Sequence, residues 1–239
     1  MSEIKRIRSL DMWRGLAIIA MVVYHLVFFL DMKDLINVNL YSIEMEVFAR
    51  VVQYSFLGLV GVAMSLVYKR KTLDDFRYFQ YVRVIEIAIW AMVFSVVSYF
   101  LFKEQFIRFG ILHLIAVSVF VITLFARKKM ALLFLSIALI LIWVGGYTGN
   151  VLDHNYLSFL GFYNGYFVSL DYFPIVPWLS VPIIGYLIGD WLSIVLQKID
   201  GYLPQSKWLQ FIGRNSLKIY VGHFPIIYIV IELFAPRIS

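Results

Sequence analysis

Several residue types and motifs are missing from this chain of 239 residues, and each absence excludes a class of site. The chain has no cysteine, which excludes disulfides, thiolate metal ligands and a cysteine nucleophile. It has no HExxH motif and no two histidines four residues apart, the spacing that lets one helix hold a metal ion. It also has neither the GxxxxGKS/T nor the GxGxxG phosphate-binding loop. We therefore expect no metal site.

Charged residues are scarce as well. They make up 15% of the chain against 62% hydrophobic residues, and the mean hydropathy is +0.83. A soluble domain of this size has no core large enough to bury so much apolar surface. We therefore expect an all-α, polytopic helical bundle in a membrane, with lipid as a partner. The net charge of +6 then reflects the sorting of basic residues between loops rather than nucleic-acid binding.

Seven apolar segments are long enough to cross about 30 Å of hydrocarbon, which takes roughly 20 residues each. No internal repeat and no linker divides the chain, so we expect a single domain over residues 1–239. The first segment lacks a small-x-small exit, which indicates a retained helix rather than a cleaved signal peptide. Gly58 and Gly61 in the second segment favour close helix packing over catalysis. The predicted segments are residues 10–30, 44–68, 81–102, 107–126, 130–148, 172–196 and 214–235.

Lys and Arg are distributed unevenly between the two sides that these segments define. Under the positive-inside rule, the excess places the N-terminus in the cytoplasm and the C-terminus outside, in a multi-pass protein of the cell membrane. We interpret the basic loops as topology signals, with a role in holding an anionic cytoplasmic substrate as the alternative. The N-terminal side carries Lys5, Arg6, Arg8, Lys69, Arg70, Lys71, Arg77, Arg127, Lys128, Lys129, Lys198, Lys207 and Arg214, and the opposite side only Lys33, Lys103 and Arg237.

The first segment contains three ionisable residues, Asp11, Arg14 and His25. At about 100° per residue, the steps from Arg14 to His25 return to within about 20° of the same direction and rise about 16 Å. Asp11 lies one turn before Arg14 on the same face. Charges in a membrane segment are costly and are by default a functional-site hypothesis. The alternative is that Asp11 and Arg14 merely neutralise each other at the cytoplasmic end.

Further polar residues lie at the depth of His25, about a third of the way in from the outer side. Arg50 follows Glu46 by four residues, so a structural ion pair is the leading interpretation there. A neutral histidine in a dry pocket can take a proton from a hydroxyl or amine, or attack an acyl group itself. This chemistry suits His25 and His113, although hydrogen-bonded packing stays open for His113. The residues at this level are Arg50, Arg108, His113 and Asp171.

The motif from Arg8 to Ala17, continued to His25, resembles the opening helix of the transmembrane acyltransferase group. That group includes the acyltransferase-3 proteins and the heparan-alpha-glucosaminide N-acetyltransferase catalytic-domain family. The spacing from Arg14 to His25 is similar to the acyltransferase-3 signature. Other blocks resemble small prokaryotic members of the heparan-acetyltransferase-like branch, namely Phe109–His113, Asp171–Trp178, and Gly213–Leu217 leading to Tyr220 and His223-Phe224-Pro225.

The resemblance implies an acetyl-CoA-dependent acyltransferase that modifies a hydroxyl or amine on a sugar or envelope component outside the membrane. It implies a catalytic role for His25 as general base or acyl carrier, and we add His113. It implies donor binding by Arg14, oriented by Asp11, and we place Arg214 with them. The residues expected to receive the acceptor are Arg50, Arg108, Asp171, Trp178 and His223, and for His223 binding and packing both remain open.

Two other classes of function compete with this interpretation. A transporter could use the same buried charges as a relay, although no inverted repeat or paired broken helices are visible. A non-catalytic membrane subunit could dock a partner helix on the polar stripe. The chain is also shorter than fuller family members, so a homodimer would supply a missing wall.

Overall fold

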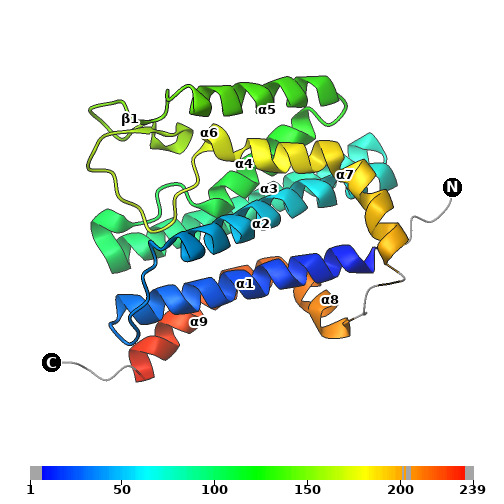
Figure 1. The fold of residues 1–239 in the computed structure, drawn as a ribbon. Helices are drawn as coiled ribbons and strands as arrows, with labels where there is room; N and C mark the ends of the chain where they lie inside the picture. Colours follow the sequence, from blue (N-terminus) through cyan, green and yellow to red (C-terminus); the bar gives the residue numbers. More distant parts are fainter. Residues whose placement is uncertain (1–6, 201, 203–205, 235–239) are drawn as a thin grey trace. The chain divides into compact units, whose positions relative to one another are not determined.

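Helices make up most of the chain in the computed structural model, which describes residues 7–200, 202 and 206–234 (Figure 1). Lys5, Arg6 and Arg237, which enter the count of topology signals, lie outside the described residues. The described elements are α1 (Arg8–Met32), α2 (Ile43–Arg70), α3 (Leu73–Phe102), η1 (Lys103–Gln105), α4 (Ile111–Leu124), α5 (Lys129–Val144), β1 (Gly149–Asn150), η2 (Ser158–Leu160), β2 (Phe162–Tyr163), α6 (Ile175–Trp178), α7 (Ser180–Ile199), α8 (Lys207–Arg214) and α9 (Ser216–Phe234).

Five helices are long and apolar enough to cross a membrane: α1, α2, α3 with η1, α6 with α7, and α9. The apolar helices α4 and α5 have only 14 and 16 residues, which gives about 21 and 24 Å of helix. The expected all-α class is therefore confirmed. The count of seven spans and the orientation of the termini stay predictions.

Local capping explains two differences from the expected segments. The third segment begins at Leu73 rather than at residue 81, because the Thr72 hydroxyl accepts a hydrogen bond from the Asp75 backbone N–H at 3.2 Å. The eight-residue α8 has no counterpart among the predicted segments. It begins after Ser206, whose hydroxyl accepts from the Leu209 backbone N–H at 3.3 Å. Helix ends thus follow caps that a hydropathy pattern does not detect.

The chain divides into two compact units. Unit 1 comprises Met1–Phe56 and Ser193–Ser239, and unit 2 comprises Leu57–Leu192. In unit 1, α8 and α9 both pack against α1. The approach of α8 is so close that a Cβ atom on Gly213 would lie 1.8 Å from the Asp11 carbonyl oxygen. A Cβ atom on Gly15 would lie 2.3 Å from the Leu209 carbonyl oxygen. Glycine is therefore required on both sides of this contact.

Helix α9 runs parallel to α1. The contacts advance by about one turn along both helices from each pair to the next, as expected for helices in register. A buried cluster of Phe29, Ile227 and Ile231 lies between the histidine and lysine levels. The successive pairs are His25 with His223, Phe29 with Tyr228, whose ring centroids lie 6.1 Å apart, and Lys33 with Glu232, whose Nζ and Oε1 lie 2.7 Å apart.

In unit 2, the end of α2 packs against α7 through glycines. A Cβ atom on Gly61 would lie 1.9 Å from the Pro182 carbonyl oxygen, and one on Gly185 would lie 2.3 Å from the Gly58 carbonyl oxygen. The expected use of glycine for close packing is confirmed for Gly61, whereas a Cβ atom on Gly58 would have nothing within 4 Å. Farther along, the Asp190 carboxylate accepts from the Ser65 hydroxyl at 2.7 Å. The two helices therefore run parallel here as well.

The connection between α5 and α6 is folded against the start of α4. Strands β1 and β2 pair in parallel, and Phe109 forms an isolated parallel bridge with Tyr172. The Tyr172 hydroxyl donates to the Ser158 carbonyl oxygen at 2.7 Å. This pairing keeps residues 106–110 out of the helix, which is why α4 begins at Ile111 rather than at residue 107.

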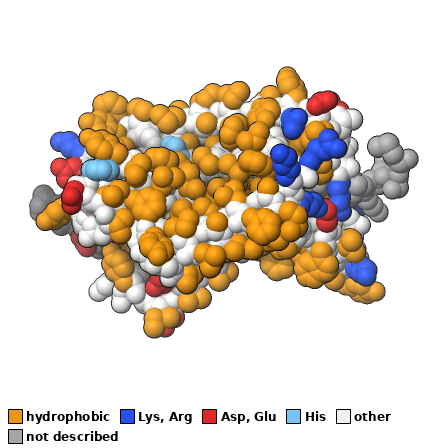
Figure 2. Space-filling model, turned by 90° about the horizontal axis from the view of Figure 1, so that it is seen from above, with side chains coloured by type: hydrophobic (Ala, Val, Ile, Leu, Met, Phe, Trp, Pro, Cys, Tyr) orange, Lys and Arg blue, Asp and Glu red, His pale blue; other side chains and the backbone are white. Residues whose placement is uncertain are grey.

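The surface is that of a protein surrounded by lipid. Hydrophobic side chains cover most of the face in Figure 2. On α3, the large apolar residues Ile85, Met92 and Phe100 are exposed by 61%, 58% and 76%. Exposed apolar residues along a whole helix are costly in water but not in hydrocarbon.

The contact between α2 and α7 yields a prediction. Gly61→Ala should lower the thermal midpoint of the detergent-solubilised protein, because its methyl group overlaps the backbone of α7; overpacking costs about 1–3 kcal/mol. Gly58→Ala is the matched control on the same helix, since a Cβ atom there has nothing within 4 Å. Equal midpoints for the two variants would contradict this account of the contact.

Candidate active site

Two histidines face each other in unit 1, one from α1 and one from α9. The Nδ1 atom of His25 lies 3.3 Å from the Nε2 atom of His223, and the ring centroids lie 4.9 Å apart. Nδ1 of His25 also lies 3.0 Å from the Met21 carbonyl oxygen. His223 is buried, whereas His25 is half-buried. Sequence reasoning selects both residues but not their contact.

Aromatic rings surround the pair. The Tyr24 ring meets His25 edge-on with centroids 5.8 Å apart, and the Tyr220 ring meets His223 at 5.3 Å. Tyr220 in turn stacks on Phe56 at 5.8 Å. These rings cover part of both imidazoles with apolar surface. A dry, partly accessible histidine pair is suited to proton transfer or to attack on an acyl group.

The N-terminal part of α1 holds an ion pair. The Arg214 Nε–H donates to Oδ2 of Asp11 at 3.3 Å, with the Asp11 side chain buried and that of Arg214 exposed by 45%. The sequence places Asp11 next to Arg14, which is half-buried one turn farther along α1. It gives no indication of the pairing with Arg214, since the two residues are 203 positions apart. All three residues predicted on the donor side, Asp11, Arg14 and Arg214, belong to unit 1.

His113 lies at the start of α4 in unit 2. Its Nδ1 atom accepts from the Gly110 backbone N–H at 3.2 Å, and its Nε2 atom lies 3.3 Å from the Ser95 hydroxyl oxygen. That hydroxyl donates to the Ile107 carbonyl oxygen at 2.6 Å. Both ring nitrogens of His113 are thus used to hold the turn before α4. Because His25 belongs to unit 1, a site shared by the two histidines stays a prediction.

Asp171 lies at the same helix start and outside the long helices. Its Oδ2 atom accepts from the Ile111 backbone N–H at 2.9 Å, which satisfies one of the unpaired donors of the first turn of α4. A Cβ atom on Gly110 would lie 2.1 Å from the same oxygen, so a larger residue there would displace this carboxylate. Burial raises the pKa of Asp171 to about 6, although the hydrogen bond from Ile111 opposes the shift.

The other predicted acceptor residues lie in different settings. The Arg108 guanidinium lies over the rings of Phe106 and Phe167, 4.6 and 5.7 Å from their centroids. Trp178 is buried against Phe173. These two residues belong to unit 2. Arg50, in unit 1, lies 3.7 Å from Glu46 in the i,i+4 pair that the sequence predicts, and both side chains are exposed.

Sequence reasoning missed Asp190 on α7. This carboxylate lies 3.1 Å from Nζ of Lys69 and 2.8 Å from Nζ of Lys129, besides its bond to Ser65. Lys69 and Lys129, which we interpret as topology signals, therefore also form ion pairs with α7. The available signal was an isolated acidic residue within an apolar segment. Its contacts indicate a structural role.

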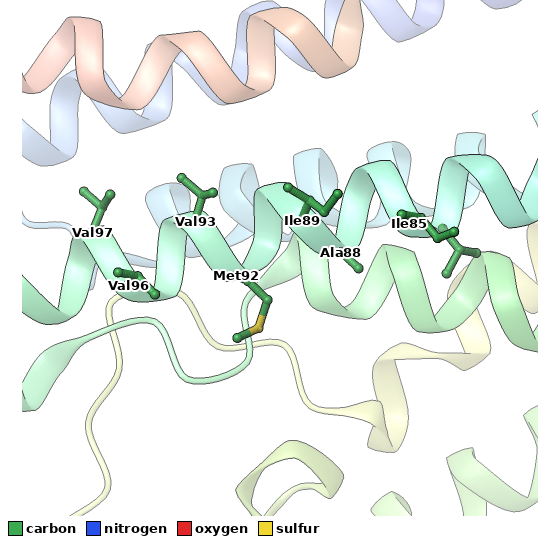
Figure 3. A pocket seen from close by; sticks show the side chains of 8 residues that line it. Ile85, Ala88, Ile89, Met92, Val93, Val96 and Val97 are labelled. Atoms are coloured by element: carbon green, nitrogen blue, oxygen red, sulfur yellow. The ribbon is translucent and has the colours of Figure 1, made fainter.

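Across the part of the chain that the structure describes, no group of three or more His, Asp or Glu residues is placed to hold a metal ion. A shallow apolar pocket lies along α3 and includes none of the candidate residues (Figure 3). Its lining suits acyl chains of lipid and consists of Val84, Ile85, Ala88, Ile89, Met92, Val93, Val96 and Val97.

Comparison with known proteins identifies one similarity. The model of the family "Heparan-alpha-glucosaminide N-acetyltransferase, catalytic" matches residues 6–225. The match extends from before α1 into α9 and includes His25, His113 and His223. Searches of curated proteins and of solved structures gave no match.

The raised pKa of Asp171 predicts a pH-dependent contribution to stability. The folded state should bind a proton that the unfolded chain releases near pH 4, so this contribution is complete below pH 4 and is lost as the pH rises towards about 6. The loss should approach about 3 kcal/mol, at about 1.4 kcal/mol per pKa unit. Asp171→Asn keeps an oxygen acceptor for Ile111 but does not titrate.

The measurement is the difference between the thermal midpoints of wild type and Asp171→Asn across pH 4–7. The midpoint of the wild type should fall relative to that of the variant between pH 4 and 6 and then run parallel to it. Curves that stay parallel over the whole range would show that Asp171 does not titrate there.

Proposed function

Because this chain belongs to the heparan-alpha-glucosaminide N-acetyltransferase catalytic family, we propose that it is an acetyl-CoA-dependent acyltransferase of the cell membrane. The acceptor is a hydroxyl or amine of a sugar or envelope component on the outer side. The observation that carries this proposal is the family match over residues 6–225, which spans both units. The same match supports one catalytic domain over residues 1–239.

The histidine pair supplies the reacting group. In the general-base route, His25 takes the proton of the acceptor hydroxyl or amine while the acceptor oxygen or nitrogen attacks the thioester carbonyl carbon. The carbon–sulfur bond then breaks, and the CoA thiolate leaves and recovers the proton from His25 as a thiol. In the carrier route, His25 attacks the thioester carbonyl carbon, the carbon–sulfur bond breaks and CoA leaves as the thiolate. The acceptor oxygen or nitrogen then attacks the acetyl-imidazole, the bond from carbon to His25 breaks, and the acceptor's proton passes by way of His25 to the CoA thiolate. Both routes need an unprotonated nitrogen on His25.

The donor occupies the cytoplasmic end of α1 in this proposal. Arg14 binds CoA phosphates through charge-assisted hydrogen bonds, for which the guanidinium fork is suited. The Asp11–Arg214 pair at the same end of α1 supports the position of the cationic groups there. His25 lies about 16 Å farther along the helix by its rise. A pantetheine arm of roughly 20 Å would bring the thioester to that level.

The acceptor is received by residues near the outer side. Asp171 and His113 hold the first turn of α4, and the Arg108 backbone N–H donates to the Ser169 hydroxyl in the same connection at 3.4 Å. We propose that His113 acts by holding this turn, because both of its ring nitrogens are already used. Acceptor contacts by Arg50, Trp178 and His223 stay predictions from the sequence.

The chain crosses the membrane seven times in this proposal, with the N-terminus in the cytoplasm. Successive spans cross the membrane in alternating directions, so the first and the last span run parallel only when the total number of spans is odd. The parallel pair α1 and α9 therefore supports an odd total. Seven spans require α4 and α5 to cross despite their length. The connection of residues 145–174 pairs with the segment before α4, and irregular backbone at membrane depth is tolerated where protein buries it. Lipid then covers the exposed face of α3, and a homodimer stays a prediction.

The topology can be tested with single cysteines, because the natural chain has none. With seven spans, Lys128→Cys faces the cytoplasm, and a membrane-impermeant maleimide should label it in inside-out vesicles but not in intact cells. Lys103→Cys is the control on the outer side and should show the opposite pattern. Labelling of both cysteines from the same side would leave α4 and α5 within one face and exclude seven spans.

The catalytic role of His25 can be tested with labelled acetyl-CoA and glucosamine as the amine acceptor. His25→Ala should lower kcat by roughly 10²–10⁴-fold, the usual contribution of a general base. His154→Ala, in the connection outside the helices, should retain wild-type activity. A His25→Ala protein that transfers acetyl groups at the wild-type rate would contradict the assignment.

A further inference from the structure

Hydrogen bonding fixes which nitrogen of His223 carries the proton. The Nδ1 atom of His223 is hydrogen-bonded to the Tyr220 carbonyl oxygen on the same helix. A carbonyl oxygen only accepts, so Nδ1 must be the donor. In the neutral imidazole, Nε2 then carries the lone pair. This nitrogen is the one that faces His25.

The same reasoning applies to His25. Its Nδ1 atom lies between two acceptors, the Met21 carbonyl oxygen at 3.0 Å and Nε2 of His223 at 3.3 Å. The Met21 sulfur lies 3.1 Å from the same nitrogen, and a thioether sulfur can accept a weak hydrogen bond but cannot donate one. A proton on Nδ1 satisfies this arrangement, whereas a lone pair there would face other lone pairs. Nε2 of His25 is therefore the basic nitrogen.

From this chain of contacts we infer that His223 is a positioning residue, which holds His25 in the tautomer whose Nε2 atom accepts the proton or attacks the acyl group. The inference rests on the proposed function for its catalytic meaning, but the tautomer itself is a property of the resting protein. His223 thereby has the role that a carboxylate has in a Ser-His-Asp triad, where the third group orients the histidine and fixes its tautomer.

A neutral imidazole differs from a carboxylate in one respect. When His25 gains a proton at Nε2, its Nδ1–H becomes a stronger donor, and Nε2 of His223 accepts from it without bringing a negative charge into the apolar site. The Tyr220 carbonyl stabilises the partial positive charge at the far end of the relay. The site can therefore pass through an imidazolium without a buried carboxylate that would need its own counter-ion.

The first test is the nitrogen-15 spectrum of histidine-labelled protein in detergent, in which the His25 signals are those lost in His25→Gln. The wild type should show His25 protonated at Nδ1 and unprotonated at Nε2. His223→Leu leaves the Met21 carbonyl as the remaining strong acceptor for Nδ1 and should raise the share of the Nε2–H form, whereas His223→Gln, whose amide oxygen can accept a hydrogen bond, should restore the wild-type share. A His223→Leu protein with the wild-type share would show that Met21 alone holds the proton and would overturn the inference. A wild-type His25 protonated at Nε2 would overturn the inference, whatever the variants do.

The second test separates positioning from packing by kinetics. His223→Leu should lower kcat by about 10- to 100-fold, less than removal of the base itself, and leave KM for acetyl-CoA within about twofold. His223→Gln should recover most of the loss. Equal kcat values for the Leu variant and wild type would overturn the inference. If neither the wild type nor any variant transfers acetyl groups but His25 is found protonated at Nδ1, the proposed function fails and the contact that positions His25 stands.

Discussion

The close approach of α8 to α1 is the contact on which the arrangement of unit 1 depends. Gly213 and Gly15 remove the side chains that would hold the two backbones apart, and Arg214 then reaches Asp11. Only Asn215 separates α8 from α9, so the same contact sets the level at which α9 begins along α1. About two turns after α9 begins, His223 meets His25. The contact between His223 and the proposed base thus depends on Gly15 and Gly213, which lie nearer the start of α1.

The sequence was sufficient to predict the helical class, the positions of the long apolar helices and the polar face of α1. Hydropathy and the 3.6-residue period are local properties, and residues such as Asp11, Arg14 and His25 are detected because charge is costly in lipid. Partners were not predictable in this way. His25 and His223 are 198 residues apart, and nothing local to either residue indicates the parallel register of α1 and α9.

Three further features were missed for identifiable physical reasons. Helix α8 has eight residues and fails the length criterion for a span, although its Ser206 cap was visible in the sequence. Asp190 looked like an isolated charge, because its partners Lys69 and Lys129 had already been explained as topology signals. The use of both nitrogens of His113 depends on Ser95 and Gly110, which come together only when α3 packs against α4.

The central claim is that the cytoplasmic end of α1 binds an acetyl-CoA donor for transfer at His25. Calorimetry with acetyl-CoA and the purified protein tests it most directly. The account predicts saturable binding that Arg14→Ala weakens about tenfold or more, the loss of roughly 1.4 kcal/mol, while Lys103→Ala, in η1 of unit 2, binds as the wild type does. A folded, monodisperse protein that binds neither acetyl-CoA nor CoA would contradict the account.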